Sequence, residues 1–338
     1  MNLTSNSLLP TIPAIIVGSI ILGIVGVVFG LLFRGIDRKL VGHMQGRIGP
    51  PIVQPFRDVR KLLVKETIMP DDALPWLFNG APLVCLVTAI VLLLYVPLFG
   101  QKALLDGFGD SILILYLLIV PSLAFVAGGF ASSSPYATVG AQREMVIMMS
   151  YEFSLALVVV AIARSIVPVT NAHPFMLSTV AAYPIWNLMG PIGMVGALVL
   201  LFALLVVTPG EVAKVPFDIA EAETEIAGGI LVEYSGRNLA LFYLADVTRA
   251  FVMISLVVAL FFPYNLSPVI GIGAGIPAAI ADALFFLVKV FLTMFVSVIV
   301  VRTAMARFKI SQASYVYLIA MTLISLVGLI LIGVDLRM

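Results

Sequence analysis

Eight long apolar runs constrain this chain more than any other feature of its sequence. Each holds about twenty residues, the length that a helix needs to cross roughly 30 Å of hydrocarbon. The runs lie at about 13–33, 79–98, 111–131, 144–163, 189–208, 238–262, 280–301 and 314–333. Unpaired strands and loops cannot face lipid. The sequence therefore predicts an all-α polytopic membrane protein, a bundle of eight transmembrane helices that forms one membrane domain over residues 1–338.

The composition excludes a soluble protein. Of the 338 residues, 62% are hydrophobic and 11% are charged, whereas soluble domains carry about 25% charged residues. The net charge is +1 and no basic patch is present, so we expect no nucleic acid partner. The first apolar run lacks a preceding basic segment and an A-x-A cleavage site, which predicts a retained span and not a signal peptide.

The chain has few residues that could hold a redox group. Its one cysteine, Cys85, lies within an apolar run, which excludes an intrachain disulfide and cysteine ligation of an iron–sulfur cluster here. A buried packing thiol is the favoured interpretation. His43 and His173 have no second ligand at metal spacing, and no nucleotide-binding glycine motif occurs. We therefore expect no cofactor, metal or redox centre on this chain.

Basic residues are distributed unevenly between the connecting loops. Loops after the first, third, fifth and seventh runs hold fourteen Lys and Arg residues, whereas the opposite side holds only Lys102, Arg164 and Arg337. Because Lys and Arg concentrate on the cytoplasmic side of membrane proteins, the termini are predicted outside and the long loops in the cytoplasm. No internal repeat is evident, which disfavours a transporter built from inverted halves.

The first long loop, predicted over 34–78, contains an amphipathic segment. Between 54 and 66, apolar side chains recur at helical spacing among Arg57 and other basic residues. This pattern predicts a cytoplasmic-side amphipathic helix that lies among the lipid headgroups. A basic loop that only binds anionic lipid is the alternative.

The segment 209–236 is the most acidic part of the chain. It contains six of the eighteen carboxylates and one lysine: Glu211, Asp218, Glu221, Glu223, Glu225, Glu233 and Lys214. Acidic residues at this density beside a membrane indicate a function, and we expect a cytoplasmic coupling loop with raised, mutually dependent carboxyl pKa values.

Ionisable residues also occur inside the apolar runs. Glu144 and Glu152 lie eight residues apart, and Asp246 and Arg249 are spaced for a local ion pair. Lys289 lies near the centre of its run, seven residues after Asp282. Charges at such depth are costly and mark proton or ion pathways. Neutralised pairs, or end residues that reach the interface, are the structural alternative.

Four blocks of sequence resemble one family. They are GRIGPPIVQPFRDVRKLLVKE (46–66), GAQREMVIMMSYEFSLA (140–156), VPFDIAEAETEIAGGILVEYSG (215–236) and RTAMARFKISQ (302–312). In this order they resemble the membrane subunit that joins the peripheral arm of respiratory complex I to its membrane arm, and its counterpart in membrane-bound NiFe hydrogenases. The family has eight spans, and the acidic block is its most specific motif.

The resemblance implies roles for particular residues. Asp218, Glu221, Glu223, Glu225 and Glu233 would line a coupling funnel that faces Glu144 and Glu152, and Asp246 and Lys289 join them as buried coupling residues. Arg47 and Arg143 would lie at the junction with peripheral subunits. The basic loop residues Arg57, Lys214 and Arg302 are assigned to the same interface.

The resemblance also implies partners and a location. Iron–sulfur clusters, and a NiFe centre in a hydrogenase, would be held by peripheral subunits, and antiporter-like subunits would be membrane partners in a prokaryotic cell membrane. Three features resemble the hydrogenase branch: the short spacing after Pro51, the Arg143–Glu144 pair and Lys289. Arg302, in contrast, resembles complex I. A ferredoxin-dependent hydrogenase-like or sulfur-reducing complex is favoured. A quinone-chamber subunit is the alternative. A stand-alone transporter is disfavoured, and an inert anchor remains a competing class.

Overall fold

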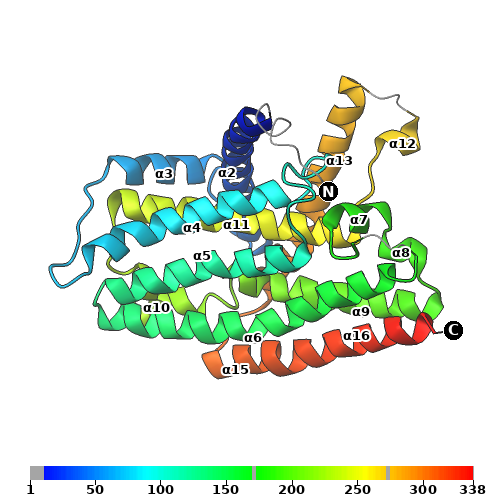
Figure 1. Ribbon diagram of the computed structural model, residues 1–338. Coiled ribbons are helices and arrows are strands. Elements are labelled where there is room, and N and C mark those ends of the chain that lie inside the picture. Colours follow the sequence, from blue (N-terminus) through cyan, green and yellow to red (C-terminus); the bar gives the residue numbers. More distant parts are fainter. Residues whose placement is uncertain (1–10, 170–172, 272–274, 338) are drawn as a thin grey trace.

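The computed structural model describes residues 11–169, 173–271 and 275–337, and these contain helices and no strands (Figure 1). Eight of the helices are long and apolar enough to span a membrane, which confirms the predicted fold class. The first six are α2 (Thr11–Met44), α4 (Pro75–Tyr95), α5 (Ser111–Ala131), α6 (Pro135–Ile166), α9 (Pro191–Glu211) and α11 (Gly236–Phe261).

Each of the last two spans contains a π-helical segment. The seventh span consists of α13 (Ile276–Met294), the π segment η3 (Phe295–Val300) and α14 (Val301–Ala304). The eighth consists of α15 (Ile310–Ser314), the π segment η4 (Tyr315–Met321) and α16 (Thr322–Asp335). Wide turns of this kind occur often at functional sites.

Helix α11 occupies the centre of the bundle. In its most apolar window 83% of the residues are buried, against 22 to 56% in the other seven spans. It packs against α2, α4 and α13 (Figure 1). Gly30 of α2 faces the backbone carbonyl of Val247 so closely that a β-carbon would clash with it. The missing side chain therefore lets α2 approach the central helix.

The first span is longer than predicted. Helix α2 continues to Met44, so the first eleven residues of the expected loop at 34–78 are helical. Their charged side chains find partners within the fold: Arg302 contacts Asp37 at 2.6 Å, and Arg38 contacts Asp58 at 2.9 Å. The length of the apolar run ended the predicted span at residue 33, because it takes no account of charged side chains that form ion pairs with distant residues.

The amphipathic helix lies against the bundle. It is α3 (Gln54–Val64), and it buries Pro55 and Val59. Val59 packs in one cluster with Leu31 and Val247 of the spanning helices. Its apolar face therefore rests partly on protein, where the sequence predicted lipid headgroups.

The acidic segment folds back onto the bundle. Between α9 and α11 it forms the 3₁₀ turn η1 (Ile219–Glu221), the short helix α10 (Glu223–Ile226) and the 3₁₀ turn η2 (Gly229–Leu231). Ala227, Gly228 and Gly229 all have positive φ, which reverses the chain. The turns η1 and η2 pack against α6, so the segment is an ordered part of the fold.

Two short helices on the other side of the bundle, α7 (Leu177–Ala182) and α8 (Ile185–Leu188), precede α9, and α12 (Ser267–Ile270) precedes α13.

Candidate functional site

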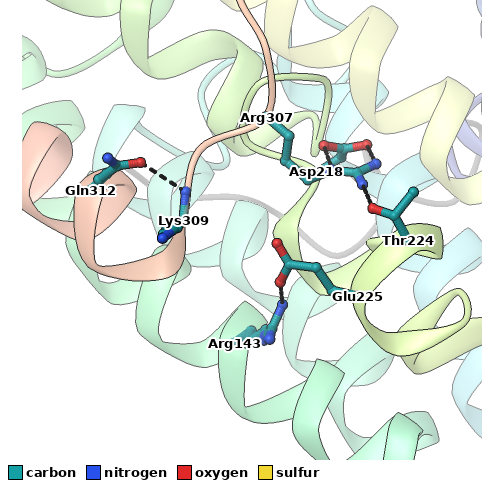
Figure 2. Close-up of polar contacts among 7 residues, drawn as sticks. All are labelled: Arg143, Asp218, Thr224, Glu225, Arg307, Lys309 and Gln312. Atoms are coloured by element: carbon teal, nitrogen blue, oxygen red, sulfur yellow. Dashed lines mark hydrogen bonds and ion pairs between the residues drawn. The ribbon is translucent and has the colours of Figure 1, made fainter.

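Two arginines hold the outer surface of the acidic segment (Figure 2). Arg307 donates through two nitrogens to the two carboxylate oxygens of Asp218, at 2.8 and 2.7 Å, and also reaches the Thr224 hydroxyl at 3.2 Å. Arg143 of α6 contacts Glu225 at 2.6 Å. A guanidinium that bonds both carboxylate oxygens fixes orientation as well as charge, so the segment is attached to two separate parts of the chain.

The remaining acids of the segment differ in exposure. Glu223 is exposed and Glu233 is half-buried, and neither forms an ion pair with any residue that the structure describes. These two acids remain on or near the surface.

Glu221 is the member of the segment that lies toward the interior. It lines a cavity of about 70 Å³ together with Arg34, Asp246 and Arg249. Burial, followed by the negative charge of Asp246, raises the pKa of Glu221 to about 7. The buried thiol of Cys85 closes another side of the cavity. The cavity thus joins a residue of the acidic segment to charges on two spanning helices.

Asp246 on the central helix is held by two cations. The Lys214 ammonium donates to its Oδ2 at 2.8 Å, and Arg34 Nη1 lies 3.4 Å from the same oxygen. Burial, followed by the positive charge of Arg34, lowers the pKa of Lys214. The local ion pair expected between Asp246 and Arg249 is wrong, because Asp246 pairs with Lys214 and Arg34.

Arg249 binds a second set of buried groups, one helical turn farther along α11. Its Nη1 donates to the Ser122 hydroxyl at 2.5 Å. Glu211, Tyr151 and Glu144 are near enough to interact electrostatically with the Arg249 charge. Only 6% of Arg249, 5% of Glu144 and 2% of Glu211 are exposed. The charge of Arg249 therefore acts on two buried carboxyl groups, although it forms an ion pair with neither of them.

These residues form one group, which we call the buried charge cluster. Its members come from the acidic segment and five spanning helices: Arg34, Ser122, Glu144, Tyr151, Glu211, Lys214, Glu221, Asp246 and Arg249.

The predicted coupling residues Glu152 and Lys289 lie outside this cluster, as do Asp218, Glu223, Glu225 and Glu233. Glu152 is half-buried on α6 and forms no hydrogen bond with the described residues, although its charge acts on Glu211. Lys289 donates to the backbone carbonyls of Phe262 and Tyr264, at 2.8 and 2.7 Å. These carbonyls follow the end of α11 that is remote from the acidic segment. Lys289 therefore satisfies free carbonyls beyond the central helix.

The predicted interface residues are divided between the surface and the interior. Arg47 and Arg57 are exposed, and Arg143 and Arg302 are half-buried in ion pairs. Lys214 is buried beside Asp246, so its geometry places it in the buried charge cluster. Arg47 and Arg302 also line a cavity of about 290 Å³ on this side of the molecule.

Sequence reasoning missed several residues of the cluster. Arg34 counts there among the loop cations, Glu211 belongs to the acidic segment without a separate role, and Tyr151 lies unremarked in the fourth apolar run. The available signal was position: Arg34 directly follows the first apolar run and Glu211 lies three residues after the fifth. Among the described residues, no group of three or more His, Cys, Asp or Glu side chains could hold a metal.

Comparison with known proteins shows the family of the chain. A family model described as "NADH dehydrogenase" matches residues 17–333. Hydrogenase-4 component C of Escherichia coli (strain K12) is 36% identical over 237 residues, covering 69% of this chain and 71% of the relative. A subunit of the NADH-quinone oxidoreductase of Paraburkholderia xenovorans (strain LB400) is 32% identical over 275 residues, covering 76% and 75%.

A solved structure is similar over nearly the whole chain. A subunit of the membrane-bound sulfane sulfur reductase, described as an archaeal respiratory membrane complex, superposes with a TM-score of 0.81 at 26% identity. The match covers 94% of this chain and 99% of that one. The protein therefore belongs to the NADH dehydrogenase family of membrane subunits, which relates it to complex I and to hydrogenase-4.

Proposed function

We propose that this chain is the coupling subunit of a ferredoxin-dependent membrane complex that evolves hydrogen or reduces sulfur compounds. In this function it docks a peripheral redox arm and links electron transfer to proton or sodium translocation. The buried charge cluster supports the proposal most directly, because ionisable groups connect the acidic segment to carboxyl groups deep in the bundle. A scaffold that only anchored the arm would not need them.

The mechanism begins at Glu221. A change of charge or proton demand at the cytoplasmic face shifts the protonation of this residue, whose pKa of about 7 makes it responsive at physiological pH. Glu221 and Asp246 line the same cavity, and two charges about 4 Å apart interact by roughly 4 kcal/mol at an effective dielectric near 20. The change therefore alters the balance between Asp246 and its two cations.

The next step is transfer toward Glu144 and Glu211. The cavity of about 70 Å³ exceeds the roughly 10–15 Å³ that one water needs, so water bound there would join Glu221 to the Arg249 guanidinium. Because the charge of Arg249 acts on both carboxyl groups, a proton bound by one would change the electrostatic environment of the other. This dependence is how protonation at the surface would reach the interior.

The electron acceptor of the complex depends on the branch of the family to which the chain belongs. The similarity to hydrogenase-4 component C and to the sulfane sulfur reductase subunit supports a hydrogenase-like or sulfur-reducing complex. The similarity to the NADH-quinone oxidoreductase relative supports the second candidate, a quinone-chamber subunit. In both, peripheral subunits carry the iron–sulfur clusters, the hydrogenase adds a NiFe centre, and antiporter-like subunits complete the membrane arm.

The cellular setting belongs to the same proposal. We infer a prokaryotic cell membrane, with both termini outside and the acidic segment in the cytoplasm, from the excess of Lys and Arg in the loops on one side.

The test measures ions moved per electron in the purified complex in vesicles. Glu221→Gln and Glu144→Gln should each lower this ratio at least tenfold while the subunits still assemble and electron transfer from ferredoxin continues. Glu66→Gln, an exposed carboxylate outside the cluster, is the matched control. Unchanged ratios in both cluster variants would leave the chain an anchor.

Two further measurements separate the alternatives. Supplying protons, sulfur compounds or a quinone in turn identifies the acceptor, and rapid quinone reduction would favour the second candidate. Substrate uptake by the chain reconstituted alone would make it a transporter. Lys289→Met in the same assay tests whether this residue contributes to coupling despite its distance from the cluster.

A further inference from the structure

A groove lies between the ends of α6 and α16 that are remote from the acidic segment. Its volume is about 470 Å³, and its lining is apolar except for Arg164 and Arg337. The apolar lining includes Val160, Ile330 and Val334, which are 43%, 53% and 39% exposed. The groove therefore combines an open apolar channel with two cations.

The two arginines lie at the same level of the bundle. Helices α6 and α16 run side by side in the same direction (Figure 1), and the hydroxyls of Ser154 and Ser325 meet at 2.7 Å where the helices touch. Arg164 follows Ser154 by ten residues and Arg337 follows Ser325 by twelve. At a rise of 1.5 Å per residue, the backbones of the two arginines lie about 15 to 18 Å along the helices from this contact. Both arginines therefore lie at the same end of the bundle, Arg164 two residues before the end of α6 and Arg337 two residues after the end of α16.

The positive charge of the groove is not neutralised by its lining. No acidic residue lines the groove, and neither arginine forms an ion pair with any residue that the structure describes. The nearby Asp335 is turned to the other side, where it accepts from the Gly190 backbone at 2.7 Å. The groove therefore has an excess of two positive charges.

Gly333 opens the groove along the helix. A β-carbon at this position would meet no atom within 4 Å, and the residue lies one turn before Arg337. The missing side chain leaves a path from the guanidinium groups toward the middle of the membrane. A side chain placed here would fill the groove without disturbing the rest of the protein.

We propose that this groove binds an anionic phospholipid, whose phosphate lies between Arg164 and Arg337 and whose acyl chain lies along the apolar lining past Gly333. Guanidinium groups bond phosphate through paired N–H donors, and the apolar channel leads away from them as an acyl chain leads away from its headgroup. A partner helix is about 10 Å wide with its side chains and would need acidic residues to match both arginines, so the lipid is the favoured occupant.

The test uses the purified full-length chain in nanodiscs or detergent micelles. We would measure by native mass spectrometry how much phosphatidylglycerol it retains relative to phosphatidylcholine. Arg164→Gln and Arg337→Gln should each reduce this preference about fivefold, the effect of one basic residue at an anionic surface. Gly333→Phe should lower retention of the lipid with both arginines intact. Gly80→Phe is the matched control, because Gly80 is also helical and faces open space.

Three outcomes would overturn the proposal. The first is a preference that is the same in wild type and in all three groove variants. The second is displacement of phosphatidylglycerol by inorganic phosphate at millimolar concentration, since that would leave an anion site without an acyl-chain contact. The third is cross-linking of the groove to a neighbouring subunit in the assembled complex with no lipid retained.

Discussion

The Lys214 ammonium lies 2.8 Å from Oδ2 of Asp246, across 32 residues of sequence. This bond joins the start of the acidic segment to the central helix. Because Arg34 approaches the same oxygen at 3.4 Å, one carboxylate compensates two cations. Glu221 lines the same cavity and places a second carboxyl group near Arg34 and Asp246.

Asp246→Asn should destabilise the protein by about 3 kcal/mol, because it leaves Lys214 and Arg34 without their shared anion. Unfolding by denaturant in a fixed detergent measures this. Asp58→Asn, which breaks the more exposed pair with Arg38, should cost at most about 1 kcal/mol. Equal effects of the two substitutions would contradict a buried role for Asp246.

Glu221→Gln should change how stability depends on pH. The folded-state pKa of about 7 is raised above the usual value of 4.5, so the stability that this residue contributes is fully present below about pH 4.5 and is lost as the pH rises through 7. Relative to wild type, the variant should therefore gain roughly 1 to 3 kcal/mol between these limits and no more above them. The Glu223→Gln variant, which changes an exposed carboxylate of the same segment, is measured beside it as the control.

Arg307→Lys should loosen the acidic segment, because an ammonium cannot reproduce the two parallel bonds of the guanidinium with Asp218. Amide hydrogen exchange in residues 217–226 should become faster, with little change in α4 or α5. The Arg143→Lys variant should affect mainly the part around Glu225. If the exchange rates of the segment are unchanged in both, the arginines do not hold it.

Gly30→Ala should destabilise the protein by about 1 to 3 kcal/mol, since the new β-carbon meets the backbone of Val247 and the two helices must separate. The matched control Gly80→Ala faces open space in α4 and should be neutral or stabilising by up to about 1 kcal/mol. A thermal melt of both variants distinguishes them, and a neutral Gly30→Ala would contradict the close approach of α2 to α11.

The number of spanning helices could be predicted from the sequence, but not where each helix ends. Apolar run length identified all eight spans, because the thickness of a bilayer fixes the length of a helix. The end of α2 could not be predicted in this way, since Asp37 and Arg38 stay helical through ion pairs with Arg302 and Asp58, and no local pattern reveals such partners.

The candidate site was predictable by residue type and not by pairing. The density of carboxylates identified the acidic segment, and Glu221 and Glu144 reach the interior as expected. The spacing of Asp246 and Arg249 on one helix suggested that they would form an ion pair. In the structure Asp246 instead pairs with Lys214, which belongs to another segment. The position of Lys289 depends on the carbonyls of Phe262 and Tyr264, which only the folded chain brings near it.

The π turn of η3 has a consequence for Arg302, which follows it in the same span. A wide turn adds one residue relative to α-helical geometry, and one residue corresponds to a rotation of about 100° around the helix axis. Arg302 therefore faces Asp37 because of a backbone irregularity several residues upstream. A relative that lacks this extra residue must orient its own side chain at this position differently, even where the letters of the sequence agree.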